Sequence, residues 1–321
     1  MSSDLATIAS LQLIQKNIYR FGGPILMILG TASCIMNFMV FTKKNLRNNP
    51  CTIYLMAFNV SSFLLIFTCI LFATLTTGYN IDLGSHSLSF CRVRYYSMLL
   101  FEILGPCYLI LASVDRVLVT SRNALTRRRS TPHLAYTCII LITLFWSLVH
   151  IHALILTNAW QVTPGYYVCY FKFSIHVTLI TYYSLVIKSV LVPLLMLIFG
   201  LWSVKNVRTV ANIAPLSIIP TIASVGVRVM HTKRAKDRQL LRILLVDIII
   251  YLMFALMITI VLIYQQFTNY LTRTLVELQI QSLLLTCGIF SAYVPFCIGC
   301  YTNLLASKTF RQEIKNIFLC K

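Results

Sequence analysis

Residues 134–157 read LAYTCIILITLFWSLVHIHALILT, and this stretch decides the fold class. It contains no Asp, Glu, Lys or Arg, and its apolar residues cover every face of a helix instead of one stripe. A helix needs about 20 predominantly apolar residues to cross the hydrocarbon core of a bilayer. Membrane β-barrel strands would show short alternating segments instead. The stretch therefore predicts a transmembrane α-helix.

The composition of the whole chain agrees with lipid as its main solvent. Its 321 residues would suit two water-soluble domains of about 150 residues each by length alone. Apolar residues make up 58% of the chain, however, charged residues only 11%, and the mean hydropathy is +0.81. A water-soluble protein usually has about 25% charged residues. The composition therefore excludes the soluble alternative.

Six further segments are also long and apolar enough to cross a membrane, and a shorter amphipathic one follows them. The six lie at 22–42, 52–76, 93–120, 178–204, 240–265 and 276–304. We therefore expect an all-α membrane protein, a seven-transmembrane-helix bundle that makes residues 1–321 a single domain. Residues 307–318 combine basic residues with Phe310, Ile314 and Phe318, which predicts a short C-terminal amphipathic surface helix.

One remaining segment, 211–230, is apolar enough to raise the question of an eighth span. Pro215, Pro220 and Gly226 disfavour a regular helix there. Basic residues also close both of its ends, so a spanning helix would place one basic cluster outside the cell. The sequence therefore predicts a long internal loop.

The distribution of lysine and arginine predicts the orientation of the chain. Most of them lie in the loops after the first, third and fifth segments and in the C-terminal tail. The other side carries Lys16, Arg20, Arg92, Arg94, Lys172 and Arg273. Because lysine and arginine are retained on the cytoplasmic face, we expect the N-terminus outside and the C-terminus inside.

The formal net charge of +19 does not indicate a nucleic-acid partner. The basic residues gather in short segments between apolar runs, as membrane topology requires. No patch combines this charge with aromatic residues exposed for stacking. We expect the chain to contact membrane lipid and no nucleic acid.

A cysteine and a charged motif lie at opposite ends of the third segment. Cys91 stands just before it, and Asp115-Arg116-Val117 stands near its other end. A further cysteine, Cys169, lies between the fourth and fifth segments. This combination resembles the rhodopsin-like (class A) G protein-coupled receptors, and the resemblance covers nearly the whole chain.

Other positions agree with this family, and some depart from it. Gly30, residues 37–40 (NFMV), Trp146 and Pro193 stand where similar residues stand in the family. The residues that depart from it are Ser62 in place of the second helix's aspartate, Met257 near the place of the sixth helix's proline, and GCYTN at 299–303 in place of N-P-x-x-Y. The overall pattern looks like a divergent, peptide-receptor-like branch.

The resemblance implies a disulfide between Cys91 and Cys169. These are the only two cysteines in external polar segments, where oxidation is favoured. Cys320, beside the tail's surface helix, is a candidate for palmitoylation, and a bare cytosolic thiol is the alternative.

The resemblance also implies a switch around Arg116. Asp115 would hold Arg116 in the idle receptor, and Asp237 at the start of the sixth segment is a second candidate partner. Release of Arg116 would open a cytoplasmic cleft for a heterotrimeric G protein, and Arg238 would line that cleft. The alternative is that Arg116 only reaches the membrane surface.

Ligand binding is expected on the inner face of the third helix. Met98 and Glu102 are four residues apart and share that face, which by resemblance lines the ligand pocket together with Tyr293. Ionisable groups inside spans are functional candidates, so Glu102 predicts a ligand with a basic group, a peptide or small molecule. The alternative is a neutral or internally paired Glu102 that serves packing. Lys188 is expected to reach the lipid headgroups and Asp247 to be structural.

The sequence therefore predicts a plasma-membrane receptor that binds an extracellular ligand, such as a neuropeptide, and activates a G protein. The alternatives are a seven-span transporter or channel, and a receptor-fold protein without ligand-driven signalling. No phosphate loop, zinc motif or nucleophile–base pair is present, so we expect no enzyme and no cofactor. His150 and His152 do not share a helix face, so we expect no metal site.

Overall fold

The computed structural model describes the backbone of residues 2–44, 46–81, 87–121, 123–163, 166–171, 175–213, 224–268 and 272–319. Within these ranges, seven helices are long and apolar enough to cross a membrane. They agree with the predicted all-α membrane protein of seven spans.

The first four spans run as follows. The first joins α1 (Ser2–Asn17), η1 (Ile18–Gly22) and α2 (Gly23–Phe41), and the second joins α3 (Pro50–Leu65), η2 (Ile66–Ile70), α4 (Leu71–Ala73) and η3 (Thr74–Gly78). The third is α5 (Leu88–Val119), which the short α6 (Ala124–Arg128) follows, and the fourth joins α7 (Pro132–Val149) and α8 (His152–Leu156). The segments labelled η are π-helical turns inside otherwise α-helical spans.

A β-hairpin separates the fourth span from the fifth. Its antiparallel strands are β1 (Thr157–Thr163) and β2 (Tyr166–Phe171). The fifth span joins α9 (Ile175–Tyr183), η4 (Ser184–Leu191) and α10 (Val192–Ile213), the sixth is α11 (Ser224–Thr268), and the seventh is α12 (Leu275–Ala306) with the surface helix α13 (Lys308–Phe318) after it.

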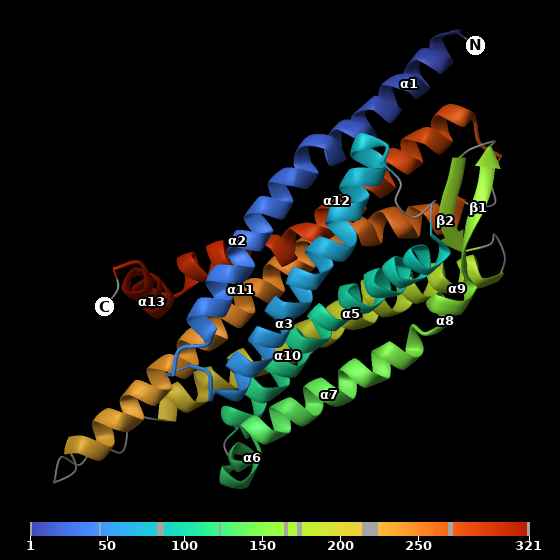
Figure 1. Cartoon of the computed structure of the whole chain (residues 1–321). Helices are drawn as coiled ribbons and strands as arrows, with labels where there is room; N and C mark the ends of the chain where they lie inside the picture. The colour runs from blue at the N-terminus through green and yellow to red at the C-terminus, as the bar shows by residue number, and fades with distance from the viewer. Residues whose placement is uncertain are drawn as a thin grey trace.

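The spans form an elongated bundle with two distinct ends (Figure 1). The N-terminus and the hairpin lie at one end, called the hairpin end here, and α6 and α13 lie toward the other, called the α13 end. An odd number of spans places the two termini at opposite ends.

Local sequence signals explain where several spans begin. The side chains of Asn49, Ser87 and Thr131 accept hydrogen bonds from the first turns of α3, α5 and α7. Thr274 and Glu277 form a capping box at the start of α12. Each such cap satisfies a backbone N–H that has no partner within the helix and contributes about 0.5–2 kcal/mol.

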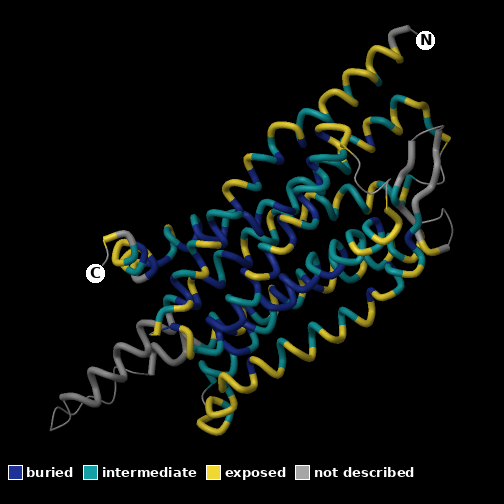
Figure 2. Tube along the Cα trace, viewed as in Figure 1, coloured by how far each residue is buried: buried dark blue, intermediate teal, exposed yellow. Residues whose placement is uncertain are grey.

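The core of the bundle lies along α3 and α5 (Figure 2). Half of the apolar stretch of the second span (50%) and 56% of that of α5 lie inside the protein, against 11% for the fourth span. The outer helices therefore present apolar side chains outward, where lipid would contact them. Gly30 lets α2 approach this core closely, because a Cβ atom there would lie 2.7 Å from Cδ1 of Ile66.

The structure corrects two expectations about the elements and adds a hairpin that was not expected. The first span begins at Ser2 and not near residue 22, and Gln15 ties its outer part to α12 through a hydrogen bond to Ser282 (2.9 Å). The predicted loop at 211–230 is wrong at both flanks, because α10 runs to Ile213 and α11 begins at Ser224. Gly226 alone does not end a helix, and residues 214–223 lie outside the described residues. The hairpin of β1 and β2 was also not predicted from the sequence.

Candidate functional site

A disulfide joins the hairpin to the first turn of α5. Cys91 of α5 and Cys169 of β2 are bonded, with their Cα atoms 5.8 Å apart. The Nε of Arg92 also donates a hydrogen bond to the backbone oxygen of Thr157 (3.1 Å), where β1 begins. These two links hold the hairpin across the end of α5.

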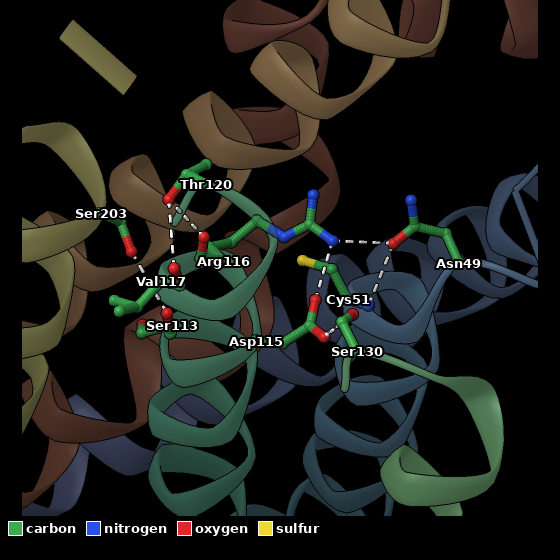
Figure 3. Close-up of polar contacts among 9 residues, drawn as sticks. All are labelled: Asn49, Cys51, Ser113, Asp115, Arg116, Val117, Thr120, Ser130 and Ser203. Carbon is green, nitrogen blue, oxygen red and sulfur yellow. Dashed lines mark hydrogen bonds and ion pairs between the residues drawn. The ribbon is translucent and has the colours of Figure 1, made fainter. Parts of the chain in front are cut away.

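Near the other end of α5, Arg116 forms a buried polar cluster (Figure 3). Its side chain is 1% exposed, and its Nη2 donates to Oδ2 of Asp115 at 2.8 Å and to Oδ1 of Asn49 at 3.0 Å. Ser130 donates to the other carboxylate oxygen of Asp115. A guanidinium buried in this way is not reaching the membrane surface, so the alternative that Arg116 only snorkels is wrong.

Asn49 has two roles in this cluster. As the N-cap of α3 it accepts a hydrogen bond from the backbone N–H of Cys51 (3.0 Å), and the same oxygen accepts from Arg116. Neither Asn49 nor Ser130 was identified from the sequence as a site residue. The Asn49-Pro50 pair is a signal of a helix start and could have identified the cap, but the sequence does not show that α5 approaches it.

The fifth span packs against the same end of α5 (Figure 3). Ser203 donates to the backbone oxygen of Ser113 (3.2 Å), and Asn206 donates to that of Val117 (3.5 Å). Thr120 donates to the backbone oxygen of Arg116 (2.6 Å). Arg116 is thus enclosed by the helix start of α3 on one side and by α10 on the other.

Three predicted residues cannot be placed in this cluster. The backbone of Asp237 and Arg238 belongs to α11, but their side chains lie outside the described residues. Cys320 also lies outside them. Their predicted roles in coupling and lipidation stay predictions.

The other candidate site is a cavity of about 490 Å³ among α5, α9, η4, α11 and α12. Met98, Glu102 and Tyr293, the three residues predicted to bind a ligand, all line it. Met98 follows Cys91 by seven residues on α5, or about 10 Å along the helix. The cavity therefore belongs to the hairpin half of the bundle.

Inside the cavity, Glu102 of α5 forms an ion pair with Lys188 of η4. Nζ of Lys188 lies 2.6 Å from Oε2 of Glu102, and the two side chains are 14% and 32% exposed. The expectation that Lys188 reaches the headgroups is therefore wrong. Lys188 lies in the π-helical stretch η4, 13 residues after α9 begins at Ile175, so it stands well inside the span and not at its outer end. The pairing agrees with the alternative of an internally paired Glu102.

Aromatic residues connect the lysine to the fourth span. Nζ of Lys188 lies 5.6 Å from the ring centroid of Tyr183, and the Tyr183 hydroxyl lies 3.0 Å from Nε2 of His150. Nδ1 of His150 lies 2.9 Å from the backbone oxygen of Trp146. Because a carbonyl only accepts, Nδ1 carries the proton and Nε2 accepts from Tyr183. His150 is therefore a hydrogen-bonded core residue, and no group of three potential metal ligands occurs among the described residues.

A second buried acid lies between α11 and α12. Asp247, 8% exposed, accepts a hydrogen bond from Thr302 (3.4 Å). The next residue, Asn303, donates to Oδ1 of Asn37 on α2 (3.2 Å). The segment that stands in place of N-P-x-x-Y thus links three spans through side-chain hydrogen bonds.

Comparison with known proteins adds no family assignment. No protein-family model matches the chain, and no curated protein matches it either.

Proposed function

We propose that this chain is a rhodopsin-like G protein-coupled receptor of the plasma membrane. In this proposal an extracellular ligand binds in the cavity at the hairpin half. A heterotrimeric G protein binds at the α13 end once Arg116 is released. The observation that carries the proposal is the buried Arg116 cluster on the same helix as the cavity and the disulfide.

The burial of charged side chains inside the spans supports a functional role for both the Arg116 cluster and the cavity. Ionisable groups in spans are costly and rare, and they mark functional sites by default. Arg116, Asp115, Glu102 and Lys188 are all paired within the protein. One charged site lies near the middle of α5 and the other near its end, and two such sites on one helix suit a protein that passes a signal along that helix.

The contacts of Arg116 suit a resting state. Asp115 and Asn49 hold the guanidinium against the start of α3, so it does not point toward a partner protein. A ligand in the cavity contacts α11 and α12, the helices that join Asp247 to Thr302 near the other end. In this proposal a ligand moves α11, and that movement frees Arg116 from Asp115 and Asn49.

Orientation and lipid contact belong to the same proposal. The basic residues on α6, α13 and the loops of the α13 end favour the cytoplasm for that end. In α13, Phe310 and Ile314 are buried while Arg311 and Lys315 are exposed. The buried side chains hold α13 against the bundle, and its exposed basic residues suit a helix next to the inner membrane surface, where anionic headgroups attract lysine and arginine.

The test is activation of G proteins in cells that express the chain, measured without ligand and against a panel of neuropeptides and small molecules. An empty vector gives the background. We expect activation that depends on Arg116, either basal or driven by a ligand of the panel. A chain that reaches the surface and carries ions or solutes without Arg116-dependent activation would instead be a transporter or channel. Arg116-dependent basal activity with no response to any ligand would indicate a receptor fold without ligand-driven signalling.

A further inference from the structure

We propose that the cavity selects a ligand of zero net charge that carries a hydrogen-bond donor and an acceptor side by side, as a carboxamide does. The ligand binds to the intact Glu102–Lys188 ion pair instead of replacing one of its members. This inference rests on the proposed ligand-binding function of the same cavity. It takes the place of the expectation, drawn from Glu102 alone, that the ligand carries a basic group.

The charge balance of the cavity wall is the first argument. Of the described residues that line the cavity, Glu102 and Lys188 are the two of charged types, and they form an ion pair at 2.6 Å. A cationic ligand that took Glu102 would leave the Lys188 ammonium, 14% exposed, without its partner. An anionic ligand would do the same to Glu102. A buried charge that loses its partner is destabilising, and the cost is smaller for the partly exposed Glu102 than for Lys188, so either exchange opposes binding.

The unused hydrogen-bonding capacity of the pair gives the second argument. Lys188 donates to Oε2 of Glu102, and among the described residues Oε1 accepts no hydrogen bond. An ammonium has three N–H donors, and a carboxylate accepts through both oxygens. The pair therefore offers an acceptor and a donor next to each other. A carboxamide matches both, because its N–H donates to Oε1 while its carbonyl accepts from Nζ.

The rest of the wall describes the remainder of the ligand. Most of it is apolar or aromatic, with Met98, Leu262, Ile289, Tyr251 and Phe296 among its residues. A volume of about 490 Å³ lies within the range of pockets for small organic ligands, roughly 300–1,000 Å³. The ligand class is thus a small aryl or alkyl carboxamide whose apolar body lies against these side chains.

The experiment uses the purified full-length chain and three probes of similar size: 2-naphthylacetamide, 2-naphthylethylamine and 2-naphthylacetate. Binding is measured from the shift of the thermal unfolding midpoint over a concentration series. We expect the wild type to bind the uncharged amide about tenfold tighter than the cationic amine or the anionic acetate, a difference of about 1.4 kcal/mol.

Exchange of one charge should reverse this order in a defined direction. Glu102→Gln frees Lys188 and should favour 2-naphthylacetate, whereas Lys188→Gln frees Glu102 and should favour 2-naphthylethylamine. Glu313→Gln and Lys315→Gln on α13 make the same chemical changes outside the cavity and should keep the wild-type order. If a single variant does not purify, Glu102→Gln/Lys188→Gln leaves neither charge in the cavity and should favour neither charged probe over the other. The amine and the acetate should then bind within about threefold of each other, or about 0.7 kcal/mol.

Two results would overturn the proposal. One is a wild type that binds the amine or the acetate as tightly as the amide. The other is an amide that produces no shift at all at millimolar concentration. Activation that depends on Arg116, measured in cells that express the same chain, would survive either result, so loss of the ligand class is distinguishable from loss of the receptor function.

Discussion

Two ion pairs on α5 differ in how the protein holds them. Arg116 pairs with its chain neighbour Asp115, and both side chains are at most 5% exposed. Glu102 pairs with Lys188 across to the fifth span, and the Glu102 side chain is 32% exposed at the cavity. Fourteen residues separate Glu102 from Arg116, or about 21 Å along the helix.

The difference indicates two roles: the Arg116 pair holds helices together, and the Lys188 pair offers a surface that a ligand can contact. The pair at Arg116 is buried and has little room for a small molecule, and Asn49 and Ser130 add further hydrogen bonds to it. It therefore opens only if helices move. The pair at Lys188 lies on a cavity wall and keeps capacity for a ligand without any helix movement. The two pairs should consequently respond differently to mutation.

The largest expected effect is on the buried pair. Arg116→Ala should abolish G protein activation while surface expression is retained, because the residue that would meet the G protein is lost. Activation is measured in cells at matched surface levels. Arg20→Ala, an exposed arginine near the hairpin end, is the matched control and should signal normally. Full activation by the Arg116→Ala chain would remove the distinction between the two pairs.

The disulfide should protect the cavity end and not the Arg116 end. Cys169→Ala frees the hairpin from α5 and should cost about 2–4 kcal/mol of stability. Surface expression and binding of 2-naphthylacetamide should fall. The molecules that still reach the cell surface should keep their basal activation of the G protein. Flow cytometry and thermal unfolding measure the loss. Cys287→Ala, at a half-buried free cysteine of α12, is the control. An equal loss in both variants would show that the bond does not support this end.

The cavity pair should show its coupling in a double-mutant cycle. Glu102→Gln and Lys188→Gln each leave one charge unpaired, so each should destabilise the chain by about 1–3 kcal/mol. The double variant should recover most of that loss, because no unpaired charge remains. Thermal unfolding midpoints of the four forms give the interaction energy. Additive losses would mean that the pair contributes no coupling.

The seven spans could be predicted from the sequence, because an apolar run of about 20 residues has few alternatives to crossing a bilayer. Cys91 and Arg116 were identified from their positions at the two ends of the third segment, and Cys169 from its place between the fourth and fifth segments, a combination that resembles a receptor family. Lys188 was misplaced, because its place near the outer end of the fifth segment suggested the headgroups, and the sequence does not show that it faces Glu102 of α5. Asn49 and Ser130 were missed for another reason. Their contacts with Arg116 and Asp115 depend on how helices pack, and local sequence patterns do not encode that.

The smallest expected effect tests whether Asn49 restrains Arg116 or only caps α3. Asn49→Ala removes the cap of α3, which should cost about 0.5–2 kcal/mol, and it also removes one acceptor of Arg116. Asn123→Ala is the matched control, because the Asn123 side chain caps α6 by accepting from Leu125 (2.9 Å). Both variants should lose stability, measured by thermal unfolding.

Only Asn49→Ala should raise basal G protein activation. Of the two asparagines, Asn49 accepts a hydrogen bond from the Arg116 guanidinium, whereas Asn123 accepts from Leu125. A released Arg116 shifts the population toward the active state, and couplings of this kind are typically about 1–3 kcal/mol. With Asp115 still paired to Arg116, the rise should lie at the lower end of that range. Equal basal activation in the two variants would reduce Asn49 to a helix cap and leave Asp115 as the restraint on Arg116.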